Sequence, residues 1–179
     1  MDERKDVLAL DPSTKCTGYC LMAGNGNILD AGRFRAPTEW PGWRRALSMA
    51  DDLAALIDEI GPGRVIVEIP NNHAHGGGED SKGFGLATYG VAVGAVLHVL
   101  WRSPLRELVY PVKPSEWAGE SSKISRARQV AMLHPGYVDI ADKDSGLDVA
   151  DAIALAMFGL ELDQATINTT LRNAGVTER

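Results

Sequence analysis

Cysteine is scarce in this 179-residue sequence, and the two that occur, Cys16 and Cys20, lie four residues apart. They form no Cys-x-x-Cys pattern, and no histidine stands at zinc-ligand spacing from them, which excludes the common structural zinc sites. A disulfide between them would close only a very short loop and would stabilise little. We therefore expect two buried thiols in a reducing compartment.

A secretion signal and a long apolar run are also missing. The chain begins MDERKDV, which is charged and contains no hydrophobic signal-peptide segment. The uncharged stretch 83–101 approaches the length of a membrane span, but glycines and polar residues keep its hydrophobicity modest. We expect a buried core helix or a dimer helix there, no membrane span, and a cytoplasmic protein.

The sequence lacks the excess of positive charge that is typical of nucleic-acid-binding proteins. Lysine and arginine number 18 against 24 aspartates and glutamates, so the net charge is −6. This argues only weakly against a metal-dependent nuclease, because carboxylates that bind cations count as negative in the sequence. The length and the ordinary apolar content predict one domain over 1–179, in which the polar segment 163–179 is a flexible C-terminal tail.

The hydrophobic pattern predicts an α/β fold. Short apolar segments at 7–10, 19–23 and 28–34 predict three successive strands, with hairpin-turn chemistry at 24–27. Apolar residues then recur at three- and four-residue spacing over 43–60, which predicts an amphipathic helix. The remaining predicted elements are a strand at 64–69, a glycine-rich loop at 71–82, a helix at 84–101, a strand at 108–112 and helices at 122–133 and 147–162. This order predicts a five-stranded mixed sheet, three antiparallel strands and then two parallel ones, flanked by helices.

Four carboxylates stand at positions that are costly for an isolated charge. Asp11 ends the first strand, and Glu68 interrupts an otherwise apolar strand in which no basic residue adjoins it. Asp148 and Asp151 are three residues apart on the last helix, so they project from one face and repel each other. Taken singly, Asp11 also fits a turn residue and Asp148 a first-turn helix acid.

Divalent cations would satisfy all four carboxylates together. Hard oxygen ligands suit Mg²⁺, and Mn²⁺ can substitute for it. Two such ions can activate a water and stabilise the leaving oxygen when a phosphodiester is hydrolysed. The pattern therefore predicts a two-metal site held by Asp11, Glu68, Asp148 and Asp151, which would also be the catalytic residues.

The ordered motifs resemble those of the RuvC family of Holliday junction resolvases. The segment LALDPSTKCTGYCLM resembles the first motif, RVIVEI the second, and GLDVADAIALAMF the last. The segment VKPSEWAGESSKISRARQVAML is similar to the part that carries two functional lysines, and Lys113 and Lys123 match them in position and spacing. The similarity extends from about Val7 to Phe158.

This resemblance implies an RNase H-like fold, a homodimer and the cutting of four-way or other branched DNA, with Lys113 and Lys123 near the cut phosphate and Lys123 taking part in catalysis. The residues add a basic cluster, Lys123, Arg126 and Arg128, on one predicted helix, which together with Lys82 and Lys113 could form the DNA-binding surface. Basic clusters of this kind are also often merely solvated.

The sequence also departs from the family. Cellular RuvC proteins carry an aromatic residue three positions after the glutamate, where this chain has Asn71, followed by a glycine-rich loop with His73 and His75. This leaves the mode of junction opening and the cutting preference open, and it would fit a phage-encoded member acting in the infected cell. Gly90 and Gly94 permit close helix approach, either in a dimer or against the chain's own sheet.

Two other functions fit parts of the sequence. A YqgF-like RNase H-fold nuclease acting on RNA shares the opening strand and its turn, although the intact VIVEI strand and the chain length favour the resolvase. The Asp-Pro-Ser-Thr turn also resembles that of actin-like phosphate-binding proteins, but those need a second similar domain. ATP binding, set against Mg²⁺-dependent junction cleavage, would distinguish these alternatives.

Overall fold

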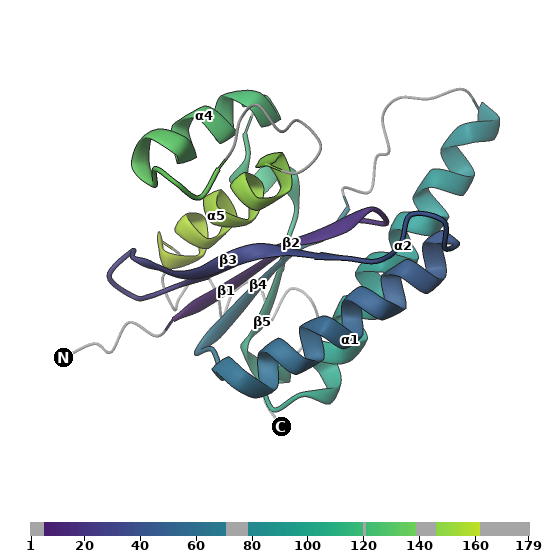
Figure 1. Cartoon of the computed structure of the whole chain (residues 1–179), viewed down its shortest axis with the longest axis horizontal. Helices are drawn as coiled ribbons and strands as arrows, with labels where there is room; N and C mark the ends of the chain where they lie inside the picture. Colours follow the sequence, from purple (N-terminus) through teal and green to yellow (C-terminus); the bar gives the residue numbers. More distant parts are fainter. Residues whose placement is uncertain (1–5, 71–78, 120, 139–145, 162–179) are drawn as a thin grey trace.

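Five strands form one mixed sheet in the order β3-β2-β1-β4-β5 in the computed structural model (Figure 1). The strands are β1 (Val7–Pro12), β2 (Cys16–Met22), β3 (Ile28–Arg35), β4 (Arg64–Glu68) and β5 (Val109–Val112). Strands β1, β2 and β3 pair antiparallel, while β4 pairs parallel with both β1 and β5. The predicted mixed sheet, with its three antiparallel and two parallel strands, is confirmed.

Helices cover both faces of the sheet. On one side lie α1 (Gly42–Ile60) and α2 (Glu79–Arg102), and on the other lie α4 (Lys123–Leu133) and α5 (Gly146–Glu161) (Figure 1). A 3-10 turn (Arg106–Leu108) and the one-turn helix α3 (Pro114–Trp117) flank β5. None of the helices in the described ranges is long and apolar enough to cross a membrane.

The structure describes the chain except for residues 1–5, 71–78, 120, 139–145 and 162–179, and it leaves out the side chains of 79–86, 88 and 146. The loop histidines and the proposed C-terminal tail therefore lie outside the described residues, as does the side chain of Lys82. Helix α2 begins at Glu79, earlier than predicted.

Successive side chains along each strand point to opposite faces of the sheet, so the hydrophobic core has two parts. In β1, Val7 and Ala9 face α5, whereas Leu8 and Leu10 face α1 and α2. Asp11 continues the first series, and Glu68 likewise follows Ile66 on the α5 side of β4. Both predicted metal ligands on the sheet are thereby directed toward the face that α5 covers.

Helix α5 packs very closely on the sheet at Gly159. A Cβ atom there would lie 2.6 Å from Cγ1 of Ile66 and 3.0 Å from Cγ1 of Val7, both of which are fully buried. Only a residue without a side chain fits at this distance. The contact sets how near the helix, and the two aspartates at its other end, lie to β1 and β4.

We expect Gly159→Ala to lower the free energy of unfolding by about 1–2 kcal/mol, because overpacking outweighs the roughly 1 kcal/mol helix advantage of alanine. Urea unfolding followed by circular dichroism measures this. In an Ile66→Ala background the same substitution should be neutral or stabilising, since its Cβ enters the space that Ile66 vacates. Equal destabilisation in both backgrounds would contradict the packing explanation.

Candidate active site

The sheet brings Asp11 and Glu68 side by side at the carboxyl ends of two parallel strands. The last paired residues of β1 and β4 are Leu10 and Val67, so Asp11 and Glu68 are the next pair along. Asp11 is only 8% exposed, and the hydroxyl of Ser13 organises the turn after it by accepting from the backbone amides of Lys15 and Cys16. The turn residues therefore fix the strand end that carries the first carboxylate.

Helix α5 adds Asp148 and Asp151 to the same place. Its first turn reaches the sheet over Gly18 of β2, the register partner of Asp11. A Cβ at Gly18 would lie 2.4 Å from the backbone oxygen of Asp148, so the approach requires glycine. The glycine of the predicted first motif thus has a direct structural function: it admits the helix that carries the other two acids.

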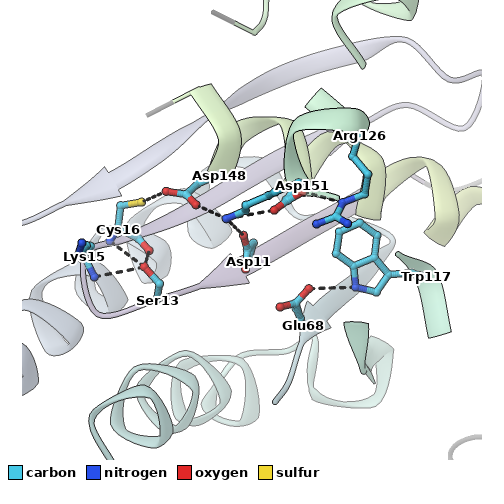
Figure 2. A network of polar contacts seen from close by, with 10 residues as sticks. Asp11, Ser13, Lys15, Cys16, Glu68, Trp117, Arg126, Asp148 and Asp151 are labelled. Atoms are coloured by element: carbon cyan, nitrogen blue, oxygen red, sulfur yellow. Dashed lines mark hydrogen bonds and ion pairs between the residues drawn. The ribbon is translucent and has the colours of Figure 1, made fainter. Parts of the chain in front are cut away.

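The side chains of Asp11, Asp148 and Asp151 point toward one another (Figure 2). The ammonium group of Lys123 from α4 forms an ion pair with each of them. Its Nζ lies 2.7 Å from Oδ1 of Asp148, 3.1 Å from Oδ2 of Asp151 and 3.9 Å from Oδ2 of Asp11. Although burial opposes it, the charge of Asp11 and the other two carboxylates raise the pKa of Lys123 above its usual range. Lys123 is therefore charged and acts as an internal counter-ion.

Asp148, Asp151 and Glu68 each accept a hydrogen bond from a side chain other than Lys123. The thiol of Cys16 donates to Oδ2 of Asp148 at 2.7 Å, and Nε of Arg126 contacts Oδ1 of Asp151 at 2.9 Å. Glu68 accepts from the indole Nε1 of Trp117 at 3.0 Å. It also accepts from the hydroxyl of Tyr89. These donors hold the carboxylates in fixed orientations.

The electrostatics of the two sheet acids differ from those of the helix acid. Burial, followed by the charge of its neighbour Glu68, raises the pKa of Asp11 well above its usual value. Burial and then Asp151 raise the pKa of Glu68 as well. For Asp148, the hydrogen bonds from Cys16 and Lys123 overcome burial and lower its pKa. The surroundings of the two sheet acids thus disfavour their charged forms, which a bound cation would favour.

The four acids offer the oxygen ligands that a hard divalent cation prefers. In this structure, however, the spacing of the three aspartates is set by the ammonium group of Lys123. All four acids are carboxylates, and three of them meet at one positive charge. Within the described ranges, no three Asp, Glu, His or Cys side chains are arranged closely enough to hold a metal ion as they stand. A cation would therefore have to displace the ammonium of Lys123 and draw the carboxylates inward.

The basic residues predicted to bind DNA lie in different surroundings. Lys113 follows directly after Val112, which is the register partner of Glu68 and the last residue of β5. It therefore lies at the carboxyl ends of the parallel strands, as Asp11 and Glu68 do. Arg128 is exposed on α4. The side chain of Arg126 is 15% exposed, and its guanidinium is engaged with Asp151 and the carbonyl of Ser121. Its position in the structure is that of a partner for Asp151.

Sequence reasoning missed four contributors to the site. Cys16 was predicted only as a buried thiol; both cysteines are indeed free and buried. Trp117 and Tyr89 received no role. An isolated tryptophan in the polar segment before α4 was the one available signal. Arg33, the register partner of Gly18, extends the same row across the sheet and helps to lower the pKa of Asp148.

We expect Lys123→Met to destabilise the protein in EDTA, because it leaves three carboxylates without their shared cation. The loss should be about 1–3 kcal/mol, a reduced value for a buried ion pair because the lysine side chain is 42% exposed. Added Mg²⁺ should then raise the unfolding temperature of the variant more than that of the wild type. Arg128→Met on the same helix is the control. Equal Mg²⁺ responses of the variant and the wild type would contradict this competition.

Known proteins resemble this chain in structure but not detectably in sequence. No protein-family profile matches it, and no curated protein matches it. Among solved structures, Thermus thermophilus RuvC in complex with a Holliday junction substrate superimposes with a TM-score of 0.62 at 17% identity, covering 96% of this chain and 97% of that one. A second structure of Thermus thermophilus RuvC gives a TM-score of 0.56 at 19% identity over the same shares.

A eukaryotic structure shares the fold as well. The yeast mitochondrial Holliday junction resolvase Ydc2 superimposes with a TM-score of 0.55 at 12% identity, covering 94% of this chain and 82% of that one. Similarity over nearly the whole length confirms, at the level of the fold, the resemblance that the order of motifs predicted. This chain has the RNase H-like fold of the RuvC-type Holliday junction resolvases.

Proposed function

We propose that this protein is a Mg²⁺-dependent endonuclease that cuts branched DNA, four-way junctions above all. The observation that carries the proposal is the convergence of Asp11, Asp148 and Asp151 on one positive charge, with Glu68 beside Asp11. The same acids lie on a fold that known junction resolvases share. A buried set of carboxylates is costly unless cations compensate it, and a nuclease uses such cations.

The four carboxylates would hold two Mg²⁺ ions, which supply an activated water and stabilise the leaving oxygen of the phosphodiester. Asp11 and Glu68 would provide oxygen ligands from the sheet, and Asp148 and Asp151 from α5. The thiol of Cys16 would keep one oxygen of Asp148 fixed during this exchange. Arg126 would do the same for Asp151, because its guanidinium is anchored independently on the carbonyl of Ser121.

Lys123 would act in two states. Without cations its ammonium partly compensates the charge of the three aspartates; with cations bound it would be released and could contact a DNA phosphate. Lys113, at the adjacent sheet edge, and the exposed Arg128 would add phosphate contacts. These three basic residues would attract DNA locally although the net charge of the whole chain is negative.

We expect wild-type protein with Mg²⁺ to cleave labelled four-way junctions faster than linear duplex, and to lose cleavage in EDTA. Asp11→Asn and Asp151→Asn should each lower the rate at least about 100-fold, because they remove cation ligands worth several kcal/mol. Asp30→Asn is the matched control: this exposed aspartate bonds Tyr19 on the other face of the sheet. Three-way, flap and structured RNA substrates test specificity, and preferential RNA cleavage or ATP binding without cleavage would overturn the proposal.

We further propose that the protein is a homodimer that associates through α2. Gly90 and Gly94 are exposed, and a Cβ at either would meet nothing within 4 Å, so they do not pack on the chain's own sheet. Trp101 on the same helix is 66% exposed beside an apolar groove. A second copy of α2 could approach closely over the two glycines and cover the tryptophan.

Sedimentation equilibrium should give a mass near twice 19.2 kDa for the wild type at about 10 μM chain. Gly94→Arg should shift this to the single-chain mass, because the long charged side chain blocks close helix approach. Leu47→Arg places the same charge on α1, where Leu47 is exposed, and should leave the dimer intact. A wild-type protein of single-chain mass at every concentration would refute dimerisation.

A further inference from the structure

A continuous series of contacts links Glu68 on the sheet to Asp151 on α5. The indole of Trp117 donates to Glu68, its ring lies under the guanidinium of Arg126 at 5.1 Å, and Arg126 contacts Asp151. Both linking residues come from the segment that contains α3 and α4. That segment therefore joins two carboxylates that are far apart along the chain (Figure 2).

The position of Trp117 is set by the one-turn helix that carries it. Pro114 begins α3, the side chain of Glu116 accepts from the backbone amide of Lys113 at 2.6 Å, and the amide of Ala118 bonds the carbonyl of Pro114. The indole also packs against the core beneath α5. With its backbone capped and its ring packed, Trp117 presents its single N–H in a defined direction.

The chemistry of this donor matters as much as its position. An indole N–H is neutral and donates one hydrogen bond, so it holds Oε2 of Glu68 without supplying a compensating charge. Lys123, in contrast, supplies a positive charge that the aspartates share, and it has to leave when a cation arrives. A neutral donor can stay in place in both states, because it leaves the carboxylate its charge and its other oxygen.

We propose, on the basis of the metal-binding function above, that Trp117 is a positioning residue that holds Glu68 in the orientation needed to bind a divalent cation. Arg126 extends this positioning to Asp151 by packing on the indole. Trp117 itself touches no reacting atom. Loss of its N–H leaves the Glu68 carboxylate with the Tyr89 hydroxyl and without the indole donor. Cation binding then has to restrict a side chain that the wild type already holds more firmly.

The test compares Trp117→Phe with wild type by calorimetric titration of Mg²⁺ into DNA-free protein. Phenylalanine keeps an aromatic ring beneath Arg126 and removes the donor. We expect the dissociation constant for Mg²⁺ to rise about 10-fold or more. The Mg²⁺ concentration for half-maximal junction cleavage should rise by the same factor, while the rate at saturating Mg²⁺ stays within a few-fold of wild type. Trp43→Phe, at an exposed position on α1, is the matched control.

A purely structural role gives a different pattern: a lower free energy of unfolding in EDTA and an unchanged Mg²⁺ dissociation constant. If Trp117→Phe does not fold, benzothienylalanine at position 117 replaces only the N–H by sulfur, and the same increase is expected. In a Glu68→Gln background, Trp117→Phe should change Mg²⁺ affinity no further. If Trp117→Phe or the benzothienylalanine variant binds Mg²⁺ as tightly as the wild type, the proposed role of Trp117 is wrong, but the proposed function is not affected. If the wild-type protein itself binds no Mg²⁺, the proposed function is wrong as well.

Discussion

The ammonium group of Lys123 lies where three aspartates would otherwise face one another without a counter-charge that they share. Asp11 and Asp151 are 8% and 3% exposed, so water compensates little of their charge. Strand β1, helix α4 and helix α5 each contribute a charged group to this point. Their packing and their electrostatics are therefore coupled, and the arrangement of the α5 face depends on a positive charge being present there.

The fold delivers these groups through two close contacts of α5 with the sheet. At one end the helix passes over Gly18 of β2, and at the other Gly159 rests on Val7 and Ile66. A helix held at both ends cannot slide or tilt without a clash, which fixes Asp148 and Asp151 relative to β1 and β4. The acids on the sheet need no such device, because parallel pairing places Asp11 beside Glu68 directly.

The sequence alone was sufficient to predict the sheet and to single out the four carboxylates. Glu68 is the clearest case, because an acid within an apolar strand is anomalous wherever the strand lies. It was insufficient for the partners. Arg126 belongs to a basic cluster in the sequence, and only tertiary packing shows that its guanidinium contacts Asp151. Cys16 was predicted only as a buried thiol and Trp117 received no role, since hydrogen bonds to residues 132 and 49 positions away leave no local signal. The early start of α2 was missed because glycines in the sequence 79–86 disfavour a helix on propensity alone.

The donors around the carboxylates divide by charge, and this division explains how one site can exist both with and without cations. Cys16 and Trp117 are neutral donors to Asp148 and Glu68, and a raised pKa of about 12 keeps the Cys16 thiol protonated at neutral pH. They can remain when a cation binds, since they orient a carboxylate without neutralising it. Lys123 supplies charge at the centre, which makes it the group that a stronger cation would replace. Orientation thus comes from residues that stay, among them the charged Arg126 beside Asp151, and the charge shared by the three aspartates comes from a residue that can leave.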